Sequence, residues 1–186
     1  RDLFVLDRST GVMRAVPLPA AGGTREFAGT SAASLSRDGR LLAFVSYPSA
    51  TLVGREGAEV LFLYDAEANT TVEIARGVRG AGRGREPAQV AITQDGRRLA
   101  WTADTVNPTL GCPAGLRGIV VYDRVTGSRS WQRLSPDDDG RTAVALLGGI
   151  TADATIAVFT STAGDLSGGS PAGVAQTYLM PVDPNR

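Results

Sequence analysis

The stretch SLSRDGRLLAFVS at residues 34–46 decides the fold, because it recurs along the chain after 57 and then 58 residues. It returns as AITQDGRRLAWTA at residues 91–103 and, in a decayed form, as GITADATIAVFTS at residues 149–161. In each copy an Asp stands at a turn, and the residues after the turn are rich in β-branched and aromatic types. That pattern is typical of a β-hairpin. The three anchor residues are Asp38, Asp95 and Asp153.

A second element repeats with the same period. It is a short apolar run that ends in a polar turn, and it reads LFVLD at residues 3–7, LFLYD at 61–65, IVVYD at 119–123 and YLMP at 178–181. The ends of the four runs, at positions 7, 65, 123 and 181, are separated by a step of 58 residues. Gly11, Asn69 and Gly127 follow the first three runs, and both residue types tolerate the positive φ of a tight turn. A further strand is expected after each of these turns.

Two elements in one period predict a repeat of about 58 residues that forms a four-stranded sheet, which is one blade of a β-propeller. We therefore expect an all-β chain with a single β-propeller domain over residues 1–186. Within it, the repeat places a half blade at 1–18, blades at 32–76 and 88–135, and an incomplete blade at 144–183.

This arrangement amounts to about three four-stranded blades, whereas propellers have at least four. We favour the interpretation that the chain is a fragment of a larger propeller, because both ends fall in the middle of a blade. A second interpretation is that another chain closes the ring. A third is an open arc, which would leave strand edges that need covering.

The pattern SxDGRxLAF resembles the TolB-like, PD40-type (WD40-like) repeats of bacterial β-propellers. Long exported repeats of that family are similar in two further motifs, which here read SATLVG at 49–54 with AGDLSG at 163–168, and DLFVLDRSTG at 2–11. The resemblance covers essentially the whole chain and implies a periplasmic or extracellular location, with any signal segment outside this chain. It implies little about activity, because propeller blades serve many functions. The third copy departs from the pattern at Ala154 and Pro181, and the loop NPTLGCP at 107–113 is unusual.

The composition excludes several kinds of site. The chain has no His and one Cys, so it cannot build a Ser-His-Asp or Cys-His site, a zinc site or an internal disulfide. Its 19 basic residues balance 19 acidic ones, which argues against a nucleic-acid binder. No apolar run approaches the length of a membrane span. We therefore expect no catalytic residue, no metal, no cofactor and no direct membrane span.

The repeated residues have a structural interpretation. An Asp that recurs once per blade is expected to fix a turn through hydrogen bonds to the backbone and not to act as a catalytic carboxylate. Phe44, Trp101 and Phe159 stand in register, six positions after the anchors, and are expected in the core. Trp131 has no aromatic counterpart in the other copies, so an exposed binding role stays open for it beside a core role.

Three features of the loops each leave two interpretations open. The run Asp137-Asp138-Asp139-Gly140 suggests calcium, but an EF-hand loop would need Glu at position 146, where Leu146 stands, so a solvated turn is favoured. Cys112 is either a semi-buried thiol or a point of attachment to a partner or lipid. The Arg-Gly segment at 76–85 either docks on an acidic partner or is a solvated loop.

Three functions remain open at this level. The favoured one is a non-enzymatic scaffold for protein–protein interaction, including an accessory subunit of a larger, membrane-associated complex, as a homo- or hetero-oligomer. The second is the propeller part of an enzyme, either a peptidase or a carboxylate-dependent glycosidase, which would need two inward carboxylates roughly 5–10 Å apart. The third is a propeller that binds a small ligand or sugar.

Overall fold

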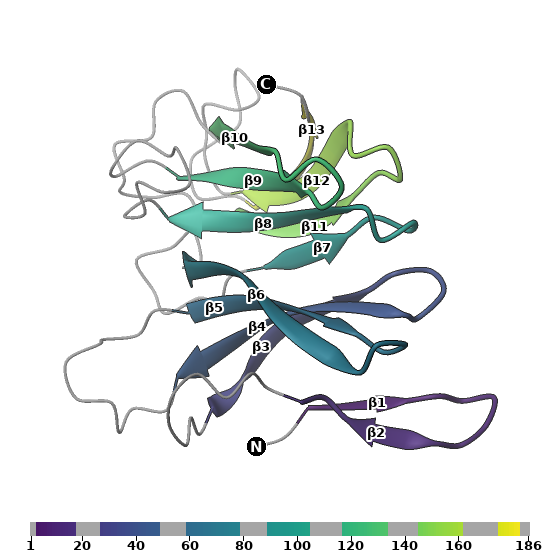
Figure 1. Ribbon diagram of the computed structural model, residues 1–186. Coiled ribbons are helices and arrows are strands. Elements are labelled where there is room, and N and C mark those ends of the chain that lie inside the picture. The colour runs from purple at the N-terminus through teal and green to yellow at the C-terminus, as the bar shows by residue number, and fades with distance from the viewer. Residues whose placement is uncertain are drawn as a thin grey trace.

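The computed structural model of the chain describes residues 3–17, 27–48, 59–78, 89–104, 117–133, 145–161 and 175–182. In these ranges the strands form four antiparallel sheets, which we call blades 1 to 4 in chain order. Figure 1 shows the blades following one another from the N-terminal to the C-terminal end of the molecule. Within the described ranges, no helix is long and apolar enough to cross a membrane.

Each blade is a meander in which strands consecutive in the chain are hydrogen-bonded neighbours. Blade 1 contains two strands, β1 (Phe4–Leu6) and β2 (Met13–Ala15). Blade 2 contains four, β3 (Phe27–Leu35), β4 (Leu41–Pro48), β5 (Glu59–Asp65) and β6 (Thr70–Val78). Blade 3 also contains four, β7 (Val90–Ile92), β8 (Arg98–Asp104), β9 (Arg117–Asp123) and β10 (Arg129–Arg133). Blade 4 contains three, β11 (Ala145–Ile150), β12 (Ile156–Ser161) and β13 (Gln176–Pro181).

Four-stranded meanders packed face to face are the blades of a β-propeller, so the predicted fold class, a partial propeller with an all-β architecture, is confirmed. The Asp-Gly turns join the first and second strands of blades 2 and 3, and the apolar runs that end in Asp are the third strands, as the repeat predicts.

The cores lie between the blades. Because side chains alternate across a strand, β4 sends Leu42 and Phe44 toward blade 1, and Leu41, Ala43 and Val45 toward blade 3. The apolar run of this strand is continuous because both of its faces are covered. The three interblade cores hold the following buried residues: Val16, Leu42, Phe44, Val60, Phe62 and Tyr64 between blades 1 and 2; Leu41, Ala43, Val45, Leu61, Leu63, Ala75, Val90, Ile92, Leu99, Trp101 and Val120 between blades 2 and 3; Ala91, Ala100, Ile119, Val121, Leu147, Ala154, Ala157, Phe159 and Val182 between blades 3 and 4.

The predicted aromatic core is confirmed. Phe44 and Trp101 are fully buried, and Phe159 is 2% exposed. Phe44 stacks on Phe62 across β4 and β5, with ring centroids 5.5 Å apart, and Phe159 stacks on Tyr178 at the same distance. The aromatic residue of each Asp-Gly hairpin therefore packs against the blade that precedes it in the chain.

Candidate functional site

The three anchor carboxylates are turn-forming residues. In each turn a hydroxyl two positions before the Asp donates to its Oδ1 at 2.6 Å, from Ser36 to Asp38, from Thr93 to Asp95 and from Thr151 to Asp153. The same hydroxyl accepts a backbone N–H from the start of the next strand, for example that of Leu41 on Ser36 Oγ at 2.9 Å. The Ser/Thr-x-Asp motif thus closes the turn from both sides, as the structural interpretation predicts.

The carboxylates at the ends of the third strands close the second set of turns. Asp7 accepts the backbone N–H of Ser9 at 2.8 Å. Asp65 accepts that of Glu67, and Asp123 that of Val125, both at 2.9 Å. Gly11, Asn69 and Gly127 have positive φ angles of 73°, 51° and 72°, as the spacing predicts.

Arginine side chains tie the two turns of a blade together. Arg40, two positions after Asp38, donates through Nε and Nη2 to Asp65, with a shortest distance of 2.9 Å. In blade 3, Arg97 and Arg98 both donate to Asp123 Oδ2, at 2.8 and 3.1 Å. The bonds connect the Asp-Gly hairpin to the third strand of the same blade.

These arginines were not singled out in the sequence, although the repeated Arg two positions after the anchor Asp was a usable signal. Blade 4 lacks both partners of this ion pair. Thr155 stands at the position of Arg40, and Pro181 at that of Asp65. The strand register is the same, since Ile156 pairs with Pro181 as Leu41 pairs with Asp65.

The carboxylates of these turns are poor candidates for a general acid. The Ser36 hydroxyl lowers the pKa of Asp38, and the Arg40 guanidinium lowers that of Asp65. Hydroxyl and backbone hydrogen bonds lower the pKa of Asp153 to about 2. Burial raises the pKa of Asp123, but hydrogen bonds from Thr126, Val125 and Arg98 outweigh it and bring the value to about 2. A group that stays ionised at neutral pH cannot serve as a general acid there.

The two buried carboxylates of the described residues do not form the pair that a glycosidase needs. The buried carboxylates in these ranges belong to Glu59 and Asp123. Glu59 begins β5 and Asp123 ends β9, so the two lie at opposite ends of equivalent third strands. Across the same ranges, no three His, Cys, Asp or Glu residues come close enough to hold a metal ion.

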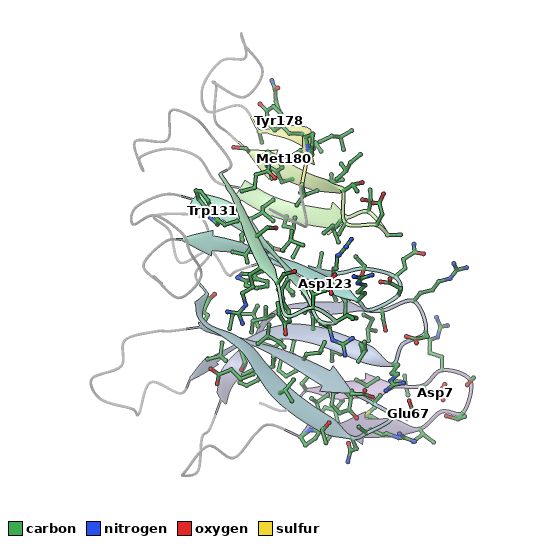
Figure 2. All side chains as sticks on the ribbon, turned by 45° about the horizontal axis from the view of Figure 1, so that its top comes forward. Asp7, Glu67, Asp123, Trp131, Tyr178 and Met180 are labelled. Carbon is green, nitrogen blue, oxygen red and sulfur yellow. The ribbon has the colours of Figure 1, made fainter. Side chains whose placement is uncertain are left out.

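Trp131 is half-buried and not an exposed binding residue. Its indole packs against the core between blades 2 and 3 and lies directly over Gly118, where a Cβ would collide with it. Figure 2 shows it on the opposite side of the sheets from Asp7 and Glu67. The Nε1 hydrogens of Trp131 and Trp101 are buried without a hydrogen-bond partner. Close packing on a glycine therefore accounts for the position of this half-buried tryptophan and favours the core interpretation.

Several predictions fall on residues outside the described ranges. These include the acidic run at 137–140, Cys112 in the loop at 107–113, and the two Ser/Ala-rich motifs at 49–54 and 163–168. The Arg-Gly segment is described only where its first residues, 76–78, end β6.

The two outermost sheets expose large apolar side chains. Phe4, Leu6 and Met13 share one face of blade 1 and are 52%, 52% and 62% exposed. On blade 4, Leu179 is 71% exposed and Ile156 is 36% exposed. The corresponding faces of the inner blades are buried; for example, Phe62 and Tyr64 of β5, which match Phe4 and Leu6 in the repeat, are each 1% exposed.

Comparison with known proteins supports the fold and goes no further. The structure of the tricorn protease is similar over 100% of this chain and 16% of its own, with 15% identity and a TM-score of 0.56. Oligogalacturonate lyase from Vibrio parahaemolyticus is similar over 97% of this chain and 41% of its own, with 16% identity and a TM-score of 0.52. A manganese complex of oligogalacturonate lyase gives 17% identity and a TM-score of 0.51, with the same two coverages.

The chain therefore spans less than half the length of each of these proteins. No protein-family model matches the chain, and no curated protein sequence matches it. The resemblance to TolB-like, PD40-type repeats stays a prediction. The structure and these similarities establish that the chain consists of β-propeller blades.

Proposed function

We propose that this chain is a non-enzymatic propeller scaffold that binds a protein partner through the exposed faces of its outermost blades. The observation that carries the proposal is the exposure of Phe4, Leu6 and Met13 on blade 1 and of Leu179 on blade 4. Exposed apolar surface of this kind marks an interaction site when it is contiguous. Phe4 and Leu6 lie on the same face of β1, and Met13 pairs directly with Leu6, so these three side chains are neighbours.

The state of the carboxylates supports the same proposal. The described turn carboxylates are engaged in turns and ion pairs, with a lowered pKa, which suits a rigid frame better than a reaction centre. In keeping with the resemblance to exported TolB-like repeats, the scaffold acts in the periplasm or outside the cell, as an accessory subunit of a larger, membrane-associated assembly.

A photo-crosslinking amino acid tests this function. It is placed at Met13 and at Leu179 in the full-length protein, produced in the cells in which the protein occurs. Val125 is the matched control, since it is 76% exposed but lies in a turn and not on an end face. We expect one defined protein adduct from position 13 or 179 and none from 125. Absence of an adduct at both face positions would contradict the scaffold function.

A second candidate is a propeller portion of an enzyme. Similarity to 41% of an oligogalacturonate lyase chain and to 16% of the tricorn protease chain favours it, because in both cases this chain matches a part of a longer enzyme. Assays of the purified full-length protein on peptides and on oligogalacturonates separate the two candidates. The scaffold proposal expects no turnover of either substrate class.

A further inference from the structure

The turn between β5 and β6 carries an asparagine where the other blades have glycine. The repeat aligns Asn69 with Gly11 and Gly127, and the three residues have positive φ angles of 51°, 73° and 72°. Glycine adopts this conformation without steric cost, whereas a residue with a Cβ adopts it less readily. The backbone of this turn therefore favours glycine, and the asparagine needs another explanation.

The contact that Asn69 makes within the fold does not supply that explanation. The Tyr64 hydroxyl donates a hydrogen bond to Asn69 Oδ1 at 3.2 Å. In blade 3, Tyr122 holds the position of Tyr64 while Gly127 holds that of Asn69, so a tyrosine at this place does not require an amide in the turn. The hydrogen bond engages Oδ1 of an exposed side chain. The amide nitrogen, Nδ2, can therefore be substituted while the bond is kept.

The hydroxyl of Thr71 is a second feature that the fold does not explain. Among the described residues, Thr71 Oγ1 is one of three buried side-chain polar atoms without a hydrogen-bond partner. The repeat places Met13 and Arg129 at the same position in blades 1 and 3, so it does not call for a hydroxyl there. A buried hydroxyl without a partner destabilises a protein relative to an apolar group of the same shape. Valine would therefore suit this position better than threonine.

These two residues belong to one known acceptor pattern. Asn69-Thr70-Thr71 matches Asn-x-Ser/Thr, in which x is not Pro and which marks the acceptor for N-linked glycosylation in a surface segment. Asn69 ends the turn, Thr70 begins β6, and both are exposed. Figure 2 shows Glu67, in the same turn, at the rim of the molecule. The pattern thus lies where a bulky, hydrated sugar chain can project into solvent.

We propose that Asn69 is the acceptor for an N-linked oligosaccharide. The donor is an oligosaccharide attached to a lipid through pyrophosphate. A bond forms between Asn69 Nδ2 and the anomeric carbon of the first sugar, and the bond from that carbon to the pyrophosphate oxygen breaks. The lipid pyrophosphate leaves with the bonding electrons, and Nδ2 loses one proton to the transferase. The inference rests on the location outside the cytoplasm given in the proposed function, but not on the identity of the protein partner.

The burial of the threonine hydroxyl sets the order of modification and folding. Asn69 is exposed in the folded hairpin, whereas Thr71 Oγ1 is buried. Thr71 pairs with Tyr64 across β5 and β6, so a transferase that recognises the hydroxyl can reach it only before these strands pair. The oligosaccharide is therefore added to the extended chain. Blade 2 then closes with the sugar chain at the rim, away from the interblade cores.

Mass spectrometry of the full-length protein, purified from the cells in which it occurs, tests the inference. Cleavage after arginine gives a peptide of residues 56–76, whose single Asn is Asn69, and a peptide of residues 99–117, whose single Asn is Asn107. Asn107 is the matched control, because Asn107-Pro108-Thr109 has the same spacing with the excluded Pro in the middle. We expect a mass increase of successive sugar residues on Asn69 and none on Asn107.

Three variants separate the modification from a role in the fold. Asn69→Gly restores the residue of blades 1 and 3 and should abolish the modification while the protein stays folded. Thr71→Val removes the unpartnered hydroxyl and should have the same two effects, whereas Thr71→Ser should keep the modification. Sugar residues that persist on this peptide in Asn69→Gly or Thr71→Val, or that fragmentation assigns to Thr70 or Thr71, would overturn the proposal.

Cell fractionation distinguishes the failure of this inference from the failure of the proposed function. An unmodified peptide 56–76 from protein recovered outside the cytoplasm overturns the modification and leaves the location of the scaffold standing. Unmodified protein recovered from the cytoplasm overturns both the modification and the location. An oligosaccharide on Asn69 supports the inference whether or not crosslinking at Met13 or Leu179 identifies a partner.

Discussion

Replacing Gly39 and Gly96 by alanine, one at a time, separates the cost of a backbone conformation from the cost of an interblade contact. Both glycines follow the anchor Asp of their turn, and both have a φ of 70°. A Cβ on Gly39 meets nothing within 4 Å, whereas a Cβ on Gly96 lies 2.5 Å from Leu41 Cδ1. Both substitutions therefore force a residue with a Cβ into a left-handed conformation, and only Gly96→Ala adds a collision with Leu41.

The magnitudes follow from these contacts. A left-handed conformation costs a residue with a Cβ about 1–2 kcal/mol, and overpacking a core costs about 1–3 kcal/mol more. Leu41 is 6% exposed and belongs to the core between blades 2 and 3, so its side chain cannot move aside into solvent. We expect Gly39→Ala to lower the free energy of unfolding by about 1–2 kcal/mol and Gly96→Ala by about 2–5 kcal/mol.

Urea denaturation followed by far-ultraviolet circular dichroism and tryptophan fluorescence measures both values. Trp101 and Trp131 lie in blade 3, so fluorescence reports on the blade that Gly96→Ala strains. In a Leu41→Ala background the collision is removed, and Gly96→Ala should then cost no more than Gly39→Ala. Equal losses for the two single variants would refute the reasoning, because they would show that Leu41 does not press on Gly96.

Three further predictions use the same denaturation assay. Ser36→Ala removes a hydroxyl that both donates and accepts in a buried turn, and should cost about 1–2 kcal/mol, whereas Ser36→Thr should cost clearly less; equal losses would contradict the turn network. The lowered pKa of Asp123 means that its ionised form stabilises the fold above the ordinary Asp value of 3.8, and that this contribution is lost as the pH falls toward about 2. Asp123→Asn should therefore flatten the dependence of the free energy of unfolding on pH between about 4 and 2. An unchanged slope would contradict this prediction. Thr155→Arg combined with Pro181→Asp should show a favourable coupling energy of about 0.5 kcal/mol in a double-mutant cycle, since the register matches that of blade 2; zero coupling would contradict an equivalent geometry in blade 4.

The fold could be predicted from the sequence because its determinants are local and repeated. The turn at Asp38 uses a hydroxyl two positions before the Asp and a glycine after it, and all of these stand in one short stretch. The aromatic at Phe44 follows at a fixed distance on the next strand. A period of about 58 residues then assigns every strand to its place in a meander without any knowledge of long-range contacts.

The contacts between blades could not be predicted in the same way. The half-buried position of Trp131 depends on Gly118 of the neighbouring strand, where the missing side chain admits the indole. Neither residue repeats, so no internal comparison could show the pairing. Interblade hydrogen bonds, such as that from Arg129 to the carbonyl of Ile74 at 2.9 Å, likewise join residues of different repeats.

The decayed copy in blade 4 shows which parts of the repeat the fold requires. It keeps the hydroxyl and carboxylate of the turn, and Ala154 takes the positive φ of the glycine it replaces, at 58°. It keeps the buried aromatic Phe159. It lacks both partners of the ion pair, because Thr155 and Pro181 stand at the positions of Arg40 and Asp65. The turn and the buried aromatic therefore persist in a blade that lacks the ion pair.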